Sequence, residues 1–403
     1  MLSKEDNAKL TQVGPGTPMG ELLRRYWHPI AAAQTLDQEL VLRLRILGEN
    51  LALFKTYKGT CGLVQERCPH RSASLAFGIP DDEGLRCPYH GWKFNETGDC
   101  VAQPFDDIDN AEAHFKDRIK ITSYPVQEMG GLVWAYMGPA PAPVLPILGR
   151  FANENLNRII DVTPLPCNFV QIMENSMDPS HFEWLHANRI NFTNRKRGKP
   201  ELMVPGRTLK LEFDEFEYGI YKRRIIEGDP PETSPDWLVG HPVLFPTTLA
   251  LPWGFQLRTP IDDENTLHIL YNVSERQPGQ EPSTVVKSTP WCDENKEFIL
   301  DTVIGTDELA WITPGAISPR HEEHLGTLDR GIIAYRNMLF ENINKVERGE
   351  DPQGIIRDSA RATYTYKTEG DLGGGWRGFH APNPGAGNSR AQEVTVAPAI
   401  GGA

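Results

Sequence analysis

Long hydrophobic runs, excess positive charge and abundant cysteine are all missing from this 403-residue sequence. Lys and Arg number 41 against 54 Asp and Glu, which gives a formal net charge of −13 and argues against binding to nucleic acid. No stretch approaches the ~20 apolar residues that cross a bilayer, and residues 1–6 lack the cationic and apolar segments of a secretory signal. We therefore expect a cytoplasmic protein that binds neither nucleic acid nor membrane.

Cysteine is scarce, with six residues in the whole chain, so a disulfide framework is not expected. In a cytoplasmic protein, grouped cysteines more often bind metals or act in catalysis. Four of the six are not grouped with another metal-ligating residue, and we predict that they are buried thiols: Cys61, Cys100, Cys167 and Cys292. A Gly-x-Gly-x-x-Gly motif between a strand and a helix is also missing, so the chain is not expected to bind a flavin or nicotinamide itself.

The distribution of apolar residues predicts two domains. From 41 to 137 apolar residues alternate with polar ones, as in β-strands, and glycines mark turns between them. The segment 138–143, Gly-Pro-Ala-Pro-Ala-Pro, cannot continue a helix or a central strand and is typical of a connector. We place the boundary there: 1–140 forms an all-β domain with a helix near its start, at 17–27, and 141–403 forms the second domain.

The second domain mixes strand patterns with helix patterns, as in an α+β fold with an antiparallel sheet. Helices are predicted at 166–190 and 329–348 from the spacing of apolar residues and from the residues at their ends. Hairpins of the sheet are predicted at 209–221 and 255–271. From 373 onward the sequence is rich in Gly, Pro and Ala, and we expect an extended or mobile tail there.

Four potential metal ligands are regularly spaced in the first domain. Cys68-Pro69-His70 is followed, after a gap of sixteen residues, by Cys87 and His90 in a Cys-x₂-His pair. Two thiolates and two imidazoles fit either a Cys₂His₂ zinc site or a [2Fe–2S] cluster whose irons take two Cys and two His respectively. A zinc finger groups its cysteines apart from its histidines, whereas each pair here mixes one of each on a predicted loop. The order therefore favours the [2Fe–2S] cluster.

A second motif lies at the start of the second domain, where Asp178, His181 and His186 form Asp-x₂-His-x₄-His. On a helix these positions lie within about one face. Two neutral imidazoles suit a transition metal, and an oxygen ligand from elsewhere would complete a facial triad with open positions. Alone, this spacing is more often a pair of hydrogen-bonded histidines, and the metal hypothesis gains weight from the first motif.

Together the two motifs resemble those of the Rieske non-haem iron oxygenases, the terminal components of aromatic ring-hydroxylating systems. The resemblance covers nearly the whole chain and implies a Rieske [2Fe–2S] domain, then a catalytic domain of helix-grip (START-like) type with a mononuclear Fe(II). Cys68, His70, Cys87 and His90 would hold the cluster, and His181 and His186 the iron. Within the family the chain looks similar to the phthalate and phenoxybenzoate dioxygenase branch, through four segments: 14–20, 24–27, 260–263 and 324–329.

The resemblance also implies roles for several acidic residues. A carboxylate on a late helix completes the iron site, and the segment Gly305–Trp311 indicates Asp307, with Asp301 and Glu308 as alternatives. The residue corresponding to Asp178 links a cluster histidine of one subunit to an iron histidine of its neighbour, which gives an electron path through His90, Asp178 and His181 in a homotrimer or stacked trimers. Asn175 resembles an Asn near the iron of some members, whereas others carry theirs at the position of Glu174.

The implied activity is hydroxylation of an aromatic substrate with O₂ and with NAD(P)H electrons from a separate flavin and iron–sulfur reductase. The branch favours an aromatic carboxylate or a diaryl ether acid, and Arg207, Arg224 and Arg258 could clamp a carboxylate. One alternative is a monooxygenase that O-demethylates a methoxylated aromatic acid. Two others belong to different classes: a Rieske electron-transfer protein, which would leave His181 and His186 without a role, and a zinc-stabilised binding protein.

Overall fold

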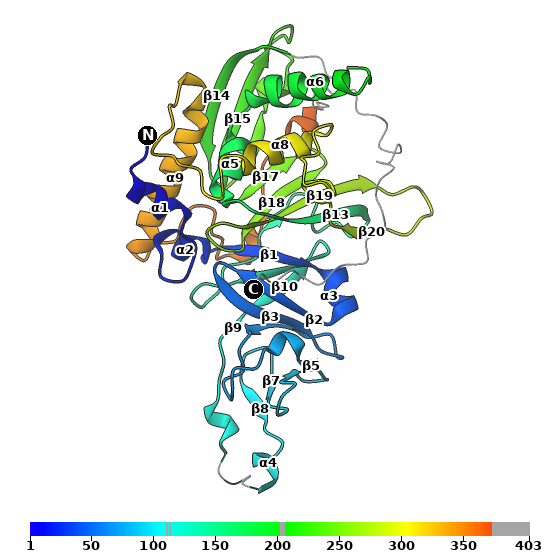
Figure 1. Cartoon of the computed structure of the whole chain (residues 1–403), viewed down its shortest axis with the longest axis vertical. Helices are drawn as coiled ribbons and strands as arrows, with labels where there is room; N and C mark the ends of the chain where they lie inside the picture. Colours follow the sequence, from blue (N-terminus) through cyan, green and yellow to red (C-terminus); the bar gives the residue numbers. More distant parts are fainter. Residues whose placement is uncertain (110–111, 113, 202–205, 373–403) are drawn as a thin grey trace.

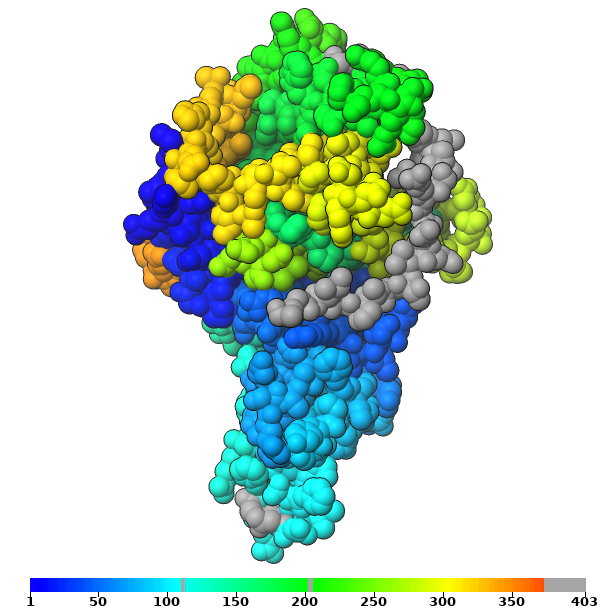
Figure 2. All heavy atoms as spheres, viewed as in Figure 1, coloured from blue at the N-terminus to red at the C-terminus, as the bar shows by residue number. Residues whose placement is uncertain are grey.

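The structure is a computed structural model that describes residues 1–109, 112, 114–201 and 206–372. Its shape is elongated, with a broad upper part and a narrow lower part (Figures 1 and 2). Within the described residues, no helix has the length and apolar character needed to cross a membrane. The tail predicted from residue 373 lies outside the described residues.

Three small antiparallel sheets build the lower part of the molecule (Figure 1). Their strands are β1 (Trp27–Ala32), β10 (Val126–Met129) and β11 (Leu132–Tyr136); β2 (Val41–Ile46), β3 (Glu49–Lys55), β4 (Cys61–Gln65) and β9 (Ser123–Tyr124); and β5 (Ile79–Pro80), β6 (Leu85–Arg86), β7 (Lys93–Phe94) and β8 (Cys100–Ala102). Short helices connect them: α3 (Ala33–Glu39), η1 (Leu75–Phe77), α4 (Asp106–Asp109) and η3 (Lys116–Arg118). The predicted short strands and long loops are therefore present.

The predicted helix at 17–27 is wrong at its C-terminal end. Helix α2 spans Pro18–Leu23 and is capped by Thr17, whose hydroxyl accepts a hydrogen bond from the Gly20 backbone. Trp27 instead opens strand β1, because its indole donates to the Pro143 carbonyl at 2.9 Å and its backbone pairs with Tyr136 of β11. An additional helix, α1 (Lys4–Thr11), precedes α2.

The upper part contains one eight-stranded sheet, ordered β14-β15-β16-β17-β18-β19-β13-β20. All neighbours are antiparallel except β13 and β20, which run parallel. The strands are β13 (Leu156–Leu165), β14 (Thr208–Phe216), β15 (Gly219–Ile226), β16 (His241–Leu244), β17 (Thr248–Leu251), β18 (Gly254–Pro260), β19 (Thr266–Glu275) and β20 (Thr284–Lys287). Both predicted hairpins are present, as β14–β15 and β18–β19, so the antiparallel sheet of the predicted α+β fold is confirmed.

Helices cover one face of this sheet (Figure 1). They are α5 (Phe169–Met177), the π-helix η4 (Phe182–Asn188), α6 (Arg189–Lys196), α8 (Val303–Ile312) and α9 (Arg330–Glu347). Helices α1 and α2 contact α5 and α9 respectively, so the first residues of the chain pack on the helices of the upper part. The remaining short elements are α7 (Pro235–Leu238), η5 (Thr327–Asp329), η6 (Ser359–Arg361), η7 (Glu369–Leu372) and the parallel pair β12 (Ile147–Leu148) and β21 (Thr363–Tyr364).

A buried ionic network fixes α5 against α9. Glu174 accepts two hydrogen bonds from Arg320, at 2.7 and 2.8 Å, and one from Arg336 at 2.6 Å. Arg336 also pairs with Glu323, and Arg320 donates to Asn7 of α1. Burial raises the pKa of Glu174, but Arg320 and Arg336 lower it further, so the net shift is downward. Glu174 is therefore a structural residue whose carboxylate is committed to two arginines.

Replacing Glu174 with glutamine is expected to lower the free energy of unfolding by about 3 kcal/mol at neutral pH, because it leaves the fully buried Arg320 without its counter-charge. The folded-state pKa of Glu174 lies below the ordinary 4.5, so its contribution is present above pH 4.5 and is lost as the pH falls through the folded-state pKa. Urea unfolding at several pH values measures this difference. The control Glu347→Gln, on the exposed side of α9, should change the free energy by less than about 0.5 kcal/mol; an equal loss in both variants would contradict the prediction.

Candidate metal centres

The predicted helix at 166–190 is interrupted at Asp178, and the interruption shapes the metal site. Asn168 caps α5 by accepting a hydrogen bond from Val170, and α5 then ends at Met177. Pro179 disfavours helical backbone at the residue before it, and Asp178 is extended, with φ −95° and ψ 106°. The chain resumes as a π-helix at Phe182 and continues as α6.

The π-helix explains how a His-x₄-His spacing can converge on one point. In an α-helix, residues five apart point in different directions, whereas a π-helix bonds residue i to i+5 and brings them onto one side. His181 stands at the N-cap of the π-helix and His186 lies within it. Their Nε2 atoms are 3.2 Å apart. The prediction of one continuous α-helix was wrong in the segment that carries both histidines.

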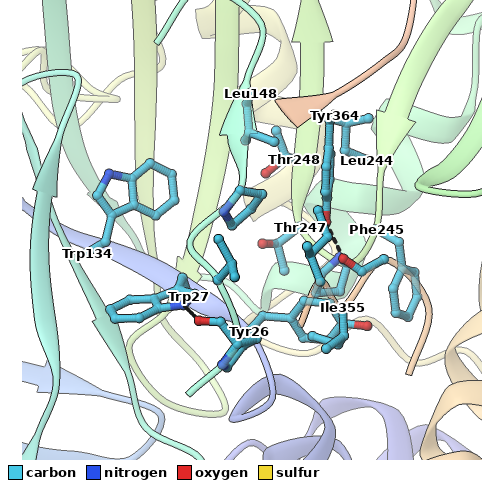
Figure 3. Close-up of a pocket in the computed structure, with 16 residues that line it drawn as sticks. Tyr26, Trp27, Trp134, Leu148, Leu244, Phe245, Thr247, Thr248, Ile355 and Tyr364 are labelled. Atoms are coloured by element: carbon cyan, nitrogen blue, oxygen red, sulfur yellow. Dashed lines mark hydrogen bonds between the residues drawn. The ribbon is translucent and has the colours of Figure 1, made fainter. Parts of the chain in front are cut away.

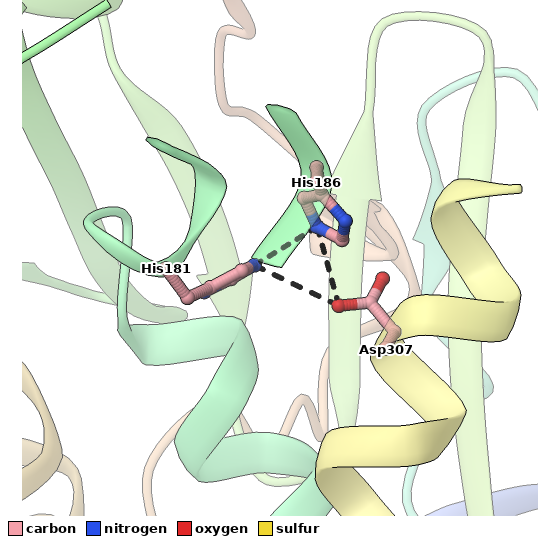
Figure 4. Close-up of side chains that lie close together, drawn as sticks. All are labelled: His181, His186 and Asp307. Carbon is pink, nitrogen blue, oxygen red and sulfur yellow. Dashed lines mark hydrogen bonds and ion pairs between the residues drawn. The ribbon is translucent and has the colours of Figure 1, made fainter. Parts of the chain in front are cut away.

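Asp307 of α8 completes a group of three side chains (Figure 4). Its Oδ1 lies 3.3 Å from His186 Nε2 and 3.7 Å from His181 Nε2. Two ligands bound at about 2.1 Å and at right angles lie ~3 Å apart, so these separations suit neighbouring positions around one ion. His186 is fully buried, Asp307 is buried and His181 is partly exposed.

The contacts around the triad leave a lone pair on each of the three atoms that face one another, His181 Nε2, His186 Nε2 and Asp307 Oδ1. Thr306 donates its hydroxyl proton to the Val303 carbonyl at 2.8 Å, so it accepts from His186 Nδ1 at 2.9 Å and fixes the proton on that nitrogen. The carboxylate of Asp178, 3.7 Å from His181 Nδ1, favours the same tautomer of His181. Two imidazole lone pairs and a carboxylate oxygen then face one another without a proton between them. A cation relieves this repulsion, so the residues present fit a metal ion.

Asp307 has the environment of a ligand carboxylate. Its Oδ1 is buried and makes no hydrogen bond of ordinary geometry within the described residues. Burial raises its pKa, but His186, His181 and Arg258 lower it further, which keeps the carboxylate charged. The two alternative ligands differ: Asp301 pairs with Arg197 at 2.7 Å near the surface, and Glu308 is absent from the triad, its pKa raised to about 8 by burial and by Asp307.

Asp178 lies between the triad and the surface. Its Oδ1 accepts hydrogen bonds from the backbone and hydroxyl of Ser180, at 2.7 and 2.5 Å. Burial raises its pKa, but His181 and Ser180 together lower it to about 2, so the carboxylate is charged. About 23% of its side chain remains accessible. Asn175, one turn earlier on α5, is half-buried, and within the described residues its side chain makes no hydrogen bond that would define a role.

The Cys68 and Cys87 loops in the lower part have the same backbone design. In each, the cysteine carbonyl accepts from the residue four positions later, Ser72 at 2.9 Å and Gly91 at 3.0 Å, and both of those residues have positive φ. Each cysteine N–H donates to the carbonyl five positions later. The loops face each other, with the rings of His70 and His90 4.6 Å apart.

The four side chains of these loops fit a cluster that is open on its histidine side. Cys68 and Cys87 are buried, whereas His70 is exposed and His90 half-buried. Burial raises the pKa of the Cys68 thiol, while the nearby backbone N–H groups of His70 and Arg71 lower it; backbone groups in such positions tune an iron–sulfur centre. Of the ungrouped cysteines, Cys100 and Cys167 are buried as predicted, but Cys61 and Cys292 are only partly buried.

Comparison with known proteins shows the family to which the chain belongs. Residues 26–122 match the family model of the Rieske [2Fe-2S] domain. The chain is 44% identical, over 89% of its length and 85% of the relative's, to the 5,5'-dehydrodivanillate O-demethylase oxygenase subunit of Sphingobium sp. (strain NBRC 103272 / SYK-6). The chain belongs to the Rieske non-haem iron oxygenases. This oxygenase is also 31% identical to the phenoxybenzoate dioxygenase subunit alpha of Ectopseudomonas oleovorans, over 88% of each chain.

The fold of the oxygenase is that of solved terminal oxygenases. The terminal oxygenase of carbazole 1,9a-dioxygenase from Novosphingobium sp. KA1 matches with a TM-score of 0.57 and 18% identity, over 82% of this chain and 93% of that one. As a member of the family shown by the Rieske domain match and the 44% identical relative, the oxygenase carries a [2Fe–2S] cluster and a mononuclear non-haem iron, and it is an enzyme that needs a reductase or ferredoxin partner. Proteins of this family are typically multimeric.

Two cavities adjoin the sheet, and only one concerns the iron site. The larger is an aromatic and proline-lined pocket where Tyr26, Trp27 and Tyr364 meet (Figure 3); no residue of the metal triad lines it. The smaller is lined by Pro179, His181, Phe182, Lys222, Arg224 and His241. Lys222 and His241 were missed by the sequence analysis. The signal for Lys222 was the alternation of β15, where Ile220, Lys222 and Arg224 occupy the buried face, whereas His241 begins β16, whose four residues are all buried.

The three arginines considered as carboxylate clamps have other contacts. Arg224 donates to Asp236 at 2.8 Å and to the Pro179 carbonyl. Arg258 donates to Ser176 at 2.8 Å and to Gln256. Arg207 is largely exposed. The structure therefore gives no support to a clamp made by these three side chains together.

Proposed function

We propose that this oxygenase O-demethylates a methoxylated aromatic acid and thereby releases a phenol and formaldehyde. The observation that carries the proposal is the 44% identity, over most of both chains, to an O-demethylase oxygenase subunit. Hydroxylation of the ring of an aromatic carboxylate or diaryl ether acid is the second candidate, supported by the 31% identity to the phenoxybenzoate dioxygenase subunit. Both reactions use the same metals and differ in which carbon of the substrate faces the iron.

In this proposal His181, His186 and Asp307 hold the iron, and Cys68, Cys87, His70 and His90 hold the cluster. When bound, the cluster supplies electrons and the iron binds and activates O₂. Thr306 keeps the proton of His186 on Nδ1. Asp178 does the same for His181 and carries a negative charge toward the surface. Asn175 stays a predicted neighbour of the iron without an assigned task.

We further propose a head-to-tail homotrimer, in which the cluster of one subunit lies beside the iron of the next. In one chain the cluster loops flank β6 and β7 at the lower end, and two other sheets separate them from α5 and α8 (Figure 1). Exposed apolar side chains occur near both centres: Phe77 and Tyr89 in the lower part, and Trp184, which is 70% exposed, in the π-helix. Such patches are typical of protein interfaces. Stacking of trimers and a cytoplasmic location remain predictions.

Product analysis tests the proposed reaction. The purified oxygenase is incubated with a reductase, NADH and either a methoxylated benzoate or biphenyl acid, or phthalate or phenoxybenzoate. O-demethylation predicts a phenol with an equal amount of formaldehyde from the methoxylated acids. Diol or catechol products without formaldehyde would favour the second candidate, and conversion of neutral aromatics alone would overturn both.

A further inference from the structure

Lys222 is a buried cation that faces the cavity beside the iron site. It lies on β15, is 6% exposed and pairs in register with His241 of β16. The cavity that it lines also contains His181 and Phe182. Lys222 therefore approaches this cavity from the sheet and shares it with His181, one of the proposed iron ligands.

Within the described part of the chain, the ammonium group of Lys222 forms no hydrogen bond or ion pair, although the side chain is only 6% exposed. A buried ammonium group is normally paired. Burial and Arg224 lower its pKa, while Asp178, Asp307 and Glu369 raise it, with a result of about 8.

Three of the four acidic groups around Lys222 are already engaged. Asp178 accepts from Ser180, Asp307 belongs to the metal triad, and Asp236 accepts from Arg224. Glu369 lies 3.3 Å from His241, but its two buried oxygens make no hydrogen bond of ordinary geometry within the described residues, and burial raises its pKa to about 7. The cations beside Lys222 are engaged as well, since Arg224 pairs with Asp236. Among the cationic side chains that line the cavity within the described residues, Lys222 is thus the one without an ion pair.

We propose that Lys222 binds the carboxylate of the aromatic acid substrate. An anion entering the cavity supplies the missing partner, and the hydrogen bonds to a charged, desolvated ammonium group are stronger than neutral ones. Phe182 also lines the cavity, and the Arg224 guanidinium lies over its ring, 4.8 Å from the centroid. The inference rests on the proposed function, because it specifies the group by which an aromatic acid is recognised.

The test compares an aromatic acid with its neutral primary amide. Lys222→Met is expected to raise KM for the acid, while kcat/KM for the amide changes little. The ratio of kcat/KM for the acid to kcat/KM for the amide should therefore fall at least about tenfold. Anaerobic titration calorimetry should show the same loss of affinity for the acid. Lys222→Arg should retain part of the preference. The control Lys210→Met, on the neighbouring strand β14 where Lys210 is exposed and pairs with Glu212, should keep the ratio of the natural enzyme.

Each outcome decides the matter. An unchanged ratio in Lys222→Met overturns the inference, and so does an equal loss of acid and amide turnover, which would mean that Lys222 only balances the charge of Asp178 and Asp307. The cluster absorption and melting temperature verify folding, and Lys222→Gln provides the same comparison if the methionine variant is unstable. If the natural enzyme converts no aromatic acid, the proposed function itself fails, whereas acid turnover with a preserved preference in the variant refutes the lysine assignment alone.

Discussion

Replacing His181 with alanine is expected to remove the mononuclear iron and leave the Rieske cluster in place. One of three converging ligands is lost, and the remaining pair, His186 and Asp307 (Oδ1 to Nε2 3.3 Å), provides too few ligands for tight binding of Fe(II). Iron analysis should fall from about three to about two atoms per chain. The visible bands of the cluster should persist, and product formation should drop more than about a thousandfold.

His114→Ala is the matched control for this experiment, because His114 is exposed and pairs only with the neighbouring Asp117 among the described residues. It should keep the iron content and activity of the natural enzyme. Loss of the cluster bands in His181→Ala would contradict the assignment of two separate sites. An unchanged iron content would show that His181 is no ligand.

The grouping of potential metal ligands could be anticipated from sequence because metal chemistry limits the residue types and their spacing. Cys68, His70, Cys87 and His90 are brought onto facing loops, and His181 meets His186. The path between the histidines could not be predicted, because a spacing of five residues gives no sign of whether the backbone is an α-helix or a π-helix. Pro179 indicated an interruption, and its consequence for the two side chains required the three-dimensional structure.

Contacts between distant segments account for what the sequence did not reveal. Asp307 lies about 120 residues after His186, and only the family resemblance indicated it. The aromatic pair Tyr26 and Trp27 fits an amphipathic helix, but Trp27 finds a partner in Pro143, and tertiary contact overrides local propensity there. Lys222 had the appearance of a surface residue in an amphipathic strand. Its burial follows from the helices that cover that face of the sheet.

Helix and strand patterns with strong periodicity were predicted well. The predicted helix 329–348 is present as α9, Arg330–Glu347, and Gly349 follows it with a φ of +77°, which terminates the helix at low cost. Strands β13 and β16 were not predicted. Each contains a proline, Pro164 or Pro242, which is uncommon inside a sheet, so their sequences gave a misleading local signal.

Replacing Asp178 with asparagine is expected to keep both metals and to abolish most turnover. The amide is nearly isosteric and can still accept the hydrogen bonds that Ser180 donates at 2.5 and 2.7 Å, so the local backbone should be retained. What is lost is the negative charge 3.7 Å from His181 Nδ1, which fixes the imidazole proton and, in the proposed trimer, links the two centres. Replacing a residue that holds a metal ligand through its other ring nitrogen typically costs 10- to 100-fold in activity, and we expect about 100-fold.

Iron content and the rate of cluster reoxidation together distinguish a role of Asp178 in electron transfer from a role in binding the iron. In Asp178→Asn, the iron content should equal that of the natural enzyme, while reoxidation of the reduced cluster by O₂ and substrate should slow in parallel with turnover. Ser180→Ala removes the hydroxyl contact to Asp178, which Asp178→Asn retains, but keeps the charge of Asp178, so its turnover should fall less than about tenfold. Full activity of Asp178→Asn would refute a coupling role. Loss of iron in that variant would instead show that Asp178 acts by holding His181 in its ligating orientation. The break in the helix at Pro179 would then serve the iron site within one subunit and not the link between subunits.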